Sequence, residues 1–174
     1  KEYRRQRQMC IRDRVNERKR PYIVMEGMSD RFMATYKRPF EAKDIKVVMY
    51  AGGLHERYGL KKLTEAFMML PQENFRLKLF GSGPFVEKLK TKYTKKDSRI
   101  QYMGVAPNAE VVAAELDASL LVNPRPTHEE FTKYSFPSKN IEYMASGTPL
   151  LTTKLPGMPK EYYPCLLYTS DAAD

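Results

Sequence analysis

The chain has little cysteine and no long apolar run. Cys10 and Cys165 are its only cysteines in 174 residues, too few for a disulfide scaffold or a cysteine-rich zinc site. No apolar stretch approaches the ~20 residues that a membrane-spanning helix needs. No charged segment followed by an apolar core opens the sequence as in a secretory signal. These absences favour a soluble globular domain of a reducing compartment, and we expect a cytoplasmic location.

Metal-binding patterns are equally scarce. The sequence contains no Asp-x-Asp pair and no cluster of histidine and cysteine, so it offers no obvious set of ligands for a divalent cation. The two histidines, His55 and His128, stand alone in expected loops. We therefore expect no metal site, and we expect both histidines to be surface residues rather than catalytic bases.

Basic residues, by contrast, are in excess. The chain carries 30 Lys and Arg against 21 Asp and Glu, a net charge of +9, and its 42% hydrophobic content argues against intrinsic disorder. Residues 1–20 alone hold nine basic and three acidic side chains. Residues 1–14 and 165–174 show no period that continues into the adjoining chain and resemble translated sequencing adapters, so we set both apart as artefactual tails. The alternative for the first tail is a genuine basic arm that binds nucleic acid or anionic lipid.

Strand-like and helical patterns alternate from residue 45 onward, after an expected loop or linker over residues 30–45. Apolar runs typical of buried strands lie at residues 47–50, 76–80, 99–104, 119–124 and 148–154. Helical periodicity lies between them, at residues 60–70, 85–93, 109–118 and 141–145. The alternation predicts an α/β fold, a Rossmann-like parallel sheet with helices on both faces.

Glycines follow at least three of the expected strands. They are Gly52 and Gly53, Gly81 and Gly83, and Gly104. Ligands of such sheets bind at the carboxyl ends of the strands, near the point where the strand order reverses. Glycine there lets backbone amides approach a phosphate closely, although it also serves simple turns.

The segment EEFTKYSFPSKNIEYMASGTPLL carries the most chemistry. Pro137 suits the first turn of a helix, and Ser138, Lys139 and Glu142 then share one face, with about 6 Å of rise between the first and the last. Free amides, a hydroxyl and an ammonium at a helix N-terminus suit a diphosphate, and a carboxylate one turn deeper can accept hydrogen bonds from a ribose diol. The alternative is that Ser138 caps the helix and that Lys139 and Glu142 form a surface pair. The spacing alone favours neither.

Five motifs together resemble one enzyme family: YAGGLHERYGLKKLTEAF, LKLFGSGP, IQYMG, LLVNPRP and SFPSKNIEYMASGTPLL. They are similar to the nucleotide-sugar-binding C-terminal domain of family 4 glycosyltransferases, retaining enzymes of the GT-B fold, and above all to the group that builds capsular polysaccharides and exopolysaccharides. The resemblance covers residues 20–164. It implies one half of a GT-B fold that binds a nucleotide-diphosphate sugar as donor, without a bound metal or other cofactor.

The resemblance also implies a division of the chain. Between the two tails, residues 15–44 would be an inter-domain segment and linker, because PYIVMEGMSD resembles the strand that precedes this domain in the family. Residues 45–164 would be the nucleotide-sugar-binding domain. The acceptor, a saccharide or a lipid-linked saccharide, would bind to an N-terminal domain missing from the segment, which is expected to show no turnover alone.

Site residues follow from the resemblance position by position. Glu142 matches the second glutamate of the family's E-x(7)-E motif, the ribose ligand, whereas Tyr134 stands where the first glutamate contacts the donor sugar. Gly53 and Tyr58 replace the arginine and lysine of the first-strand motif. Another cation must then balance the diphosphate, and the candidates are Arg57, Lys61 and Lys139.

The remaining matches complete the expected site. Gly81 and Gly83 match the second glycine loop, and Met103, Gly104 and Val105 match the stretch that contacts the base. The expected catalytic residues are Glu142, Lys139 and Arg57. The expected donor-binding residues are Gly52, Gly53, Gly81, Gly83, Met103, Gly104, Val105, Tyr134, Ser138, Lys139 and Glu142.

Two other functions remain open at this point. A nucleotide-sugar 2-epimerase would share the architecture, but its motifs differ from FPSKNIEYMASG. A basic module could use residues 4–20 and the lysine-rich helix at residues 85–93 to bind nucleic acid, but no interleaved aromatic residues accompany those charges. The same basic surface could instead rest on an anionic membrane, which suits an enzyme with lipid-linked acceptors.

Overall fold

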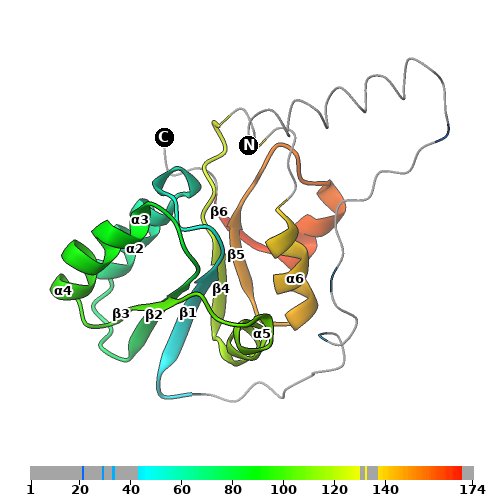
Figure 1. The fold of residues 1–174 in the computed structure, drawn as a ribbon. Coiled ribbons are helices and arrows are strands. Elements are labelled where there is room, and N and C mark those ends of the chain that lie inside the picture. The colour runs from blue at the N-terminus through cyan, green and yellow to red at the C-terminus, as the bar shows by residue number, and fades with distance from the viewer. Residues whose placement is uncertain are drawn as a thin grey trace.

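Six parallel strands form one sheet in the computed structural model, which describes residues 21, 29, 33, 43–129, 132 and 137–169. The strands are β1 (Lys46–Ala51), β2 (Phe75–Phe80), β3 (Ile100–Gly104), β4 (Leu120–Asn123), β5 (Leu150–Thr153) and β6 (Leu167–Thr169). Their order across the sheet is β3-β2-β1-β4-β5-β6 (Figure 1). All five predicted strands are present, and the predicted α/β fold with a parallel sheet is confirmed.

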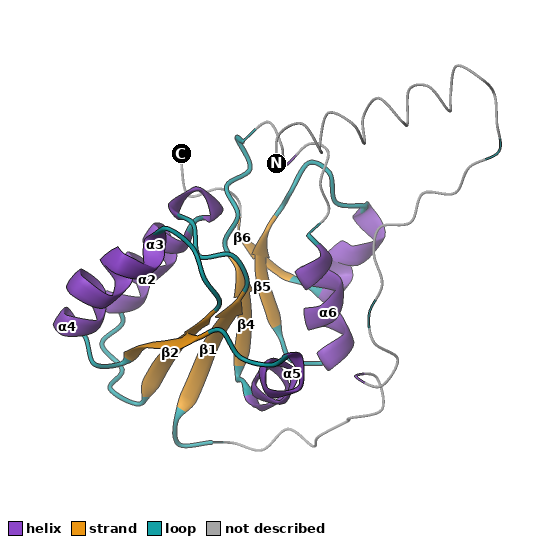
Figure 2. Cartoon of the chain, viewed as in Figure 1, coloured by secondary structure: helices purple, strands orange, loops and turns teal. Residues whose placement is uncertain are grey.

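Helices cover both faces of the sheet, as Figure 2 shows. On one side lie α2 (Leu60–Met68) and a continuous helical stretch made of α3 (Phe85–Lys88), a π-helical segment η3 (Leu89–Tyr93) and α4 (Thr94–Lys96). On the other side lie α5 (Asn108–Asp117) and α6 (Ser138–Ser146). The four predicted helices are thus present, and α2 ends two residues before the predicted boundary.

The central strand β1 explains why both faces need cover. Five of its six residues are buried, and they alternate between two hydrophobic cores because successive side chains point to opposite faces. Val48 and Tyr50 pack with α2 and α3, whereas Val47 and Met49 pack with α5 and α6. A strand that is apolar on both faces is typical of a parallel sheet.

The order of the strands places a crevice at the centre of the sheet. The chain builds outward from β1 through β2 to β3, then returns to add β4 on the opposite side of β1. Helices consequently leave β1 and β4 toward opposite faces, and the carboxyl ends of these two strands open a crevice that open α/β sheets use for ligands. Gly52 and Gly81 follow β1 and β2 at this edge, and Gly104 is the last residue of β3, as predicted.

The C-terminal segment takes part in the fold, which the sequence analysis did not predict. We set residues 165–174 apart, yet Leu166 joins the core of the α5 and α6 side, and β6 pairs in parallel with β5. A 3-10 segment, η5 (Lys160–Cys165), leads into that strand. The adapter origin of the tail stays a prediction, and residues 1–14 lie outside the described part. Among the described residues, no helix has the length and apolar character needed to cross a membrane.

Candidate functional site

Hydrogen bonds join the loops at the carboxyl ends of β1, β2 and β3. The Gly52 amide donates to the Phe80 carbonyl at 3.1 Å, and the Gly81 amide donates to the Gly104 carbonyl at 2.7 Å. A Cβ atom at Gly81, whose φ is +123°, would stand 1.9 Å from the Gly52 carbonyl oxygen. The predicted glycine rim therefore exists, and close packing between loops is itself a reason for glycine at Gly81.

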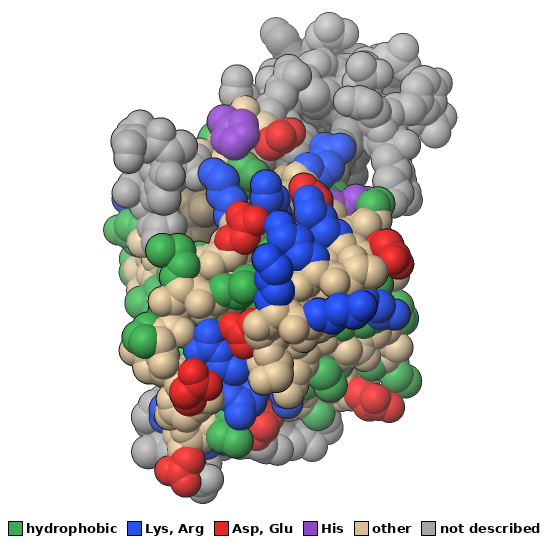
Figure 3. Space-filling model, turned by 90° about the vertical axis from the view of Figure 1, so that its left-hand side faces the viewer, with side chains coloured by type: hydrophobic (Ala, Val, Ile, Leu, Met, Phe, Trp, Pro, Cys, Tyr) green, Lys and Arg blue, Asp and Glu red, His purple; other side chains and the backbone are tan. Residues whose placement is uncertain are grey.

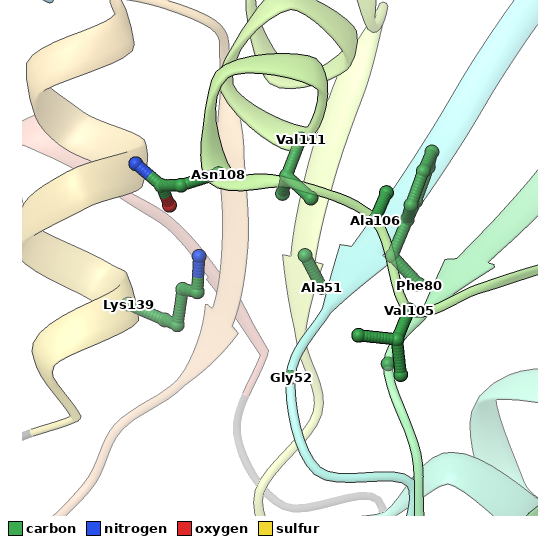
Figure 4. A pocket seen from close by; sticks show the side chains of 9 residues that line it. Ala51, Gly52, Phe80, Val105, Ala106, Asn108, Val111 and Lys139 are labelled. Carbon is green, nitrogen blue, oxygen red and sulfur yellow. The ribbon is translucent and has the colours of Figure 1, made fainter.

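A recess of about 180 Å³ opens beside this rim. It is smaller than the roughly 300–1,000 Å³ of a complete small-molecule pocket, so it fits one part of an extended ligand. Phe80, Val105 and Ala106 lie on one side, and Asn108 and Lys139 on the other (Figure 4). The remaining lining residues are Ala51, Gly52, Gly81 and Val111.

Lys139 brings a positive charge to the recess from the first turn of α6. Its ammonium lies 2.8 Å from Glu142 Oε2 on the same helix and 3.2 Å from Glu115 Oε1 on α5. The Lys139 side chain is 30% exposed and that of Glu142 is 21% exposed, whereas Glu115 is fully buried. One ammonium therefore bridges two carboxyl groups beside the rim.

Glu115 has an unusual environment for a carboxyl group. Burial raises its pKa from 4.5 to about 7, the Lys139 ammonium opposes that rise, and the Glu142 carboxylate adds to it. Desolvation dominates because a carboxylate deep in the protein loses more hydration than one ammonium at 3.2 Å restores. Near neutral pH the buried Glu115 carboxyl group is therefore only partly ionised.

Two hydrogen-bonded anchors fix α6 against the sheet. The hydroxyl of Tyr143 accepts from the Ala51 amide at 2.7 Å and donates to the Ala51 carbonyl at 3.2 Å. One turn earlier, the Asn123 side-chain amide donates to Asn140 Oδ1 at 2.5 Å. All four residues are buried, so the helix that carries Lys139 is held at the ends of β1 and β4.

The start of α6 excludes the capping role that one of the two sequence-based interpretations gave Ser138. The helix begins at Ser138, and Pro137 occupies the preceding cap position, one residue earlier than predicted, with no side-chain cap hydrogen bond. Ser138 is exposed and does not cap the helix. The Lys139–Glu142 pair of the alternative does form, but Lys139 also reaches buried Glu115, so the pair is more than a surface contact.

Other predicted residues lie farther from the recess. Arg57 in η2 (Glu56–Tyr58) and Lys61 in α2 are exposed and do not line it. Gly83 lies against the Leu54 carbonyl, 2.3 Å from where its Cβ would stand. The recess is also not lined by Gly53, Met103, Gly104, Ser138 or Glu142, although Gly53 and Gly104 are next in sequence to lining residues. Tyr134 lies outside the described residues.

A second cation that sequence reasoning missed lies at the end of β4. The guanidinium carbon of Arg125 is 4.7 Å from the centre of the Tyr58 ring, and that of Arg57 is 5.8 Å from the same ring. Both arginines therefore lie beside the Tyr58 ring. Arg125 also lies near enough to Tyr50 to lower its pKa, although burial dominates and raises that pKa to about 12.

Side chains that could bind a metal ion are dispersed among the described residues. Within the part of the chain that the structure describes, no three His, Cys, Asp or Glu side chains are grouped to hold a metal ion. His128 is exposed as predicted, whereas His55 is half-buried because its ring packs edge-on against Tyr58 at 5.1 Å.

Comparisons with known proteins agree with this architecture. The model of the family "Glycosyl transferases group 1" matches residues 45–173. The chain is 30% identical over 112 residues to a protein of Escherichia coli (strain K12) named as a colanic acid biosynthesis glycosyltransferase, WcaL; the match covers 62% of this chain and 27% of WcaL. The chain thus corresponds to much less than the whole of that relative.

Solved glycosyltransferases share the fold. The lipopolysaccharide outer core galactosyltransferase WaaB superposes with a TM-score of 0.66 and 19% identity, over 87% of this chain and 43% of WaaB. Anabaena HepE, solved in complex with UDP-glucose, superposes with a TM-score of 0.58 and 18% identity, over 73% of this chain and 35% of HepE. Since the family model covers most of the chain and the fold agrees, the chain belongs to the group 1 glycosyltransferases.

Proposed function

We propose that this chain is the donor-binding domain of a retaining family 4 glycosyltransferase that uses a nucleotide-diphosphate sugar. One observation carries the proposal: Lys139 of α6, which is paired with Glu142, lines a recess together with Gly52 and Gly81 of the glycine rim, at the edge where the strand order reverses. A cation from the first turn of a helix then lines the recess, and a partly exposed carboxylate lies 2.8 Å from that cation. Those are the groups that a diphosphate and a ribose require.

The donor would lie across the recess in three parts. Val105, in the stretch that matches the family's base-contacting motif, would border the base, and Ala106 next to it lines the same recess. The Glu142 carboxylate would accept hydrogen bonds from the ribose hydroxyls, one helical turn from Ser138. The diphosphate would then lie near the first-turn amides of α6 and the Lys139 ammonium, where the helix dipole favours an anion.

This placement accounts for the chemistry that a donor domain must supply. When the sugar leaves, negative charge grows on the leaving phosphate, so fixed cations and amides there stabilise the transition state more than the ground state. Lys139 is the predicted cation that lines the recess, and Arg57 with Arg125 would add charge at the neighbouring Tyr58 loop. The acceptor, a saccharide or a lipid-linked saccharide, would approach from the partner half of a two-domain enzyme.

Titration of the 174-residue chain with UDP, GDP, ADP and TDP tests the proposal. We expect weak, saturable binding of at least one of them, and Glu142→Ala should weaken that binding by about tenfold or more, the value of hydrogen bonds to a charged group. Glu87→Ala, which removes an exposed glutamate of α3 on the opposite side of the sheet, is the matched control. Absence of binding at millimolar ligand, or equal affinity in the Glu142→Ala variant, would refute the proposal.

A second property concerns the lysine-rich face over α2 to α4. Figure 3 shows Lys and Arg gathered on this side of the molecule; its exposed lysines are Lys61, Lys62, Lys90, Lys92, Lys95 and Lys96. We propose that this face rests on an anionic membrane while a lipid-linked acceptor is used, in a cytoplasmic enzyme. Co-sedimentation with vesicles containing 30% phosphatidylglycerol should exceed that with neutral vesicles and fall with added salt. Equal recovery with both vesicles would refute it.

A further inference from the structure

A buried acid underlies the recess and has no part in the site as predicted from sequence. Glu115 belongs to α5, one turn beyond the lining residue Val111, and its side chain is fully buried. Its Oε1 accepts from Lys139 at 3.2 Å, whereas its Oε2 is buried without a hydrogen bond to any described residue. The Glu115 backbone carbonyl accepts from Thr148 Oγ1 at 2.8 Å, so the main chain that carries this carboxyl group is anchored to the segment between α6 and β5.

This arrangement is a poor way to stabilise a fold. A fully buried carboxyl with one oxygen unsatisfied costs free energy, and an apolar side chain of similar volume would pack on this face without that cost. The ion pair with Lys139 returns only part of the loss, because Lys139 is itself 30% exposed and shared with Glu142. Such costly buried acids are found above all where a site needs them.

Lys139 is the group that gains from Glu115. A lysine at the start of a helix has four rotatable side-chain bonds and ordinarily samples many positions in solvent. Here two oxygens on two different helices hold one ammonium, at 2.8 Å and 3.2 Å. The ammonium is therefore already held beside the recess and the first turn of α6. Ligand binding then does not have to supply the free energy of ordering the Lys139 side chain.

We propose that Glu115 is a positioning residue, whose buried carboxyl group holds the Lys139 ammonium where it meets the diphosphate of the donor. This inference rests on the proposed function. Glu115 does not touch the ligand and acts through Lys139.

A double-mutant cycle tests this role, with UDP-glucose, GDP-mannose and ADP-glucose as probes and the tightest binder carried through the cycle. Glu115→Leu in the 174-residue chain should weaken binding about fivefold or more, although it should unfold at a higher temperature than the parent. In a Lys139→Met background the same substitution should change affinity less than twofold, because the residue it positions is gone. Glu110→Leu, which removes an exposed glutamate of the same helix, is the control.

A second variant keeps the test decisive if Glu115→Leu does not fold. Glu115→Gln retains an acceptor oxygen for Lys139 but cannot ionise. The charged or titratable groups facing it are Lys139, Glu142 and Tyr143. The parent should bind the nucleotide sugar about threefold more weakly at pH 8 than at pH 6, since ionised Glu115 adds a negative charge near the diphosphate; the variant should match the parent at pH 6 and lack that weakening.

The outcomes separate the two proposals. Equal losses from Glu115→Leu with and without Lys139 would overturn the positioning role while the donor site stands. Weaker binding by Glu115→Gln than by the parent at pH 6 would overturn it as well, because the retained acceptor oxygen should still hold Lys139. One pH profile shared by the parent and Glu115→Gln would overturn the effect of the added charge at pH 8. No binding of any nucleotide sugar by the parent would overturn the donor site, and the role of Glu115 with it.

Discussion

The stability of the protein should depend on pH through Glu115, and the structure gives the sign and the size. Burial raises the pKa of this carboxyl from 4.5 to about 7 in the folded chain, while the unfolded chain keeps the ordinary value. Between those pH values the folded state binds the proton more tightly, so the contribution of Glu115 to stability is full below about pH 4.5. It is lost as the pH rises through about 7.

The magnitude follows from the shift in pKa. Each pKa unit corresponds to about 1.4 kcal/mol, so raising the value from 4.5 to about 7 makes the ionised form cost on the order of 3 kcal/mol. Glu115→Gln removes the titrating group and retains its shape. The free energy of unfolding of the variant, relative to that of the parent, should therefore rise by about that amount between pH 4.5 and pH 8.

Urea unfolding at pH 4.5, 6, 7 and 8 measures the difference directly. Other titrating groups, such as Asp97, whose pKa its hydrogen bonds with the Arg99 side chain hold low, are common to both proteins and cancel in the comparison. Glu110→Gln, an exposed change on the same helix, should show no such pH-dependent difference. A constant difference between parent and Glu115→Gln across the range would refute the description of Glu115 as a buried acid that ionises at a cost.

Two further predictions concern the rim and the anchor of α6. Gly81→Ala would place a Cβ 1.9 Å from the Gly52 carbonyl oxygen and should cost about 2 kcal/mol or more, lowering the melting temperature by about 5 °C. Gly104→Ala, with open space around its Cβ, should cost about half as much, and equal losses would contradict the close packing of the rim. Tyr143→Phe removes both hydrogen bonds to buried Ala51 and should cost about 1–3 kcal/mol in urea unfolding; an unchanged midpoint would show that the anchor is dispensable.

Local patterns were sufficient to predict the sheet and its helices. The apolar run at Val47 to Tyr50 needs cover on both faces, which only a central parallel strand provides, and Gly147 ends α6 where its left-handed conformation, with φ of +74°, favours glycine. The glycine rim followed from the same patterns, because the carboxyl ends of parallel strands meet at one edge.

The side-chain contacts of the site could not be predicted from local sequence patterns. Glu115 and Lys139 lie 24 residues apart, and only the packing of α5 against α6 brings them within 3.2 Å. A local signal existed, because Val111 and Glu115 share one helical face and an acid on a buried face is unusual. Arg125 gave no such signal, because its proximity to Tyr58 depends on the pairing of β4 with β1.

The central claim is that the edge formed by the rim and α6 binds the nucleotide of a donor sugar. Amide chemical shifts of the uniformly 15N-labelled chain, recorded during titration with UDP and GDP, test it most directly. The account predicts the largest changes at Gly52, Gly81, Val105, Ala106 and Lys139, with little change over α2 to α4. Changes confined to the lysine-rich face, or no change at millimolar nucleotide, would contradict it.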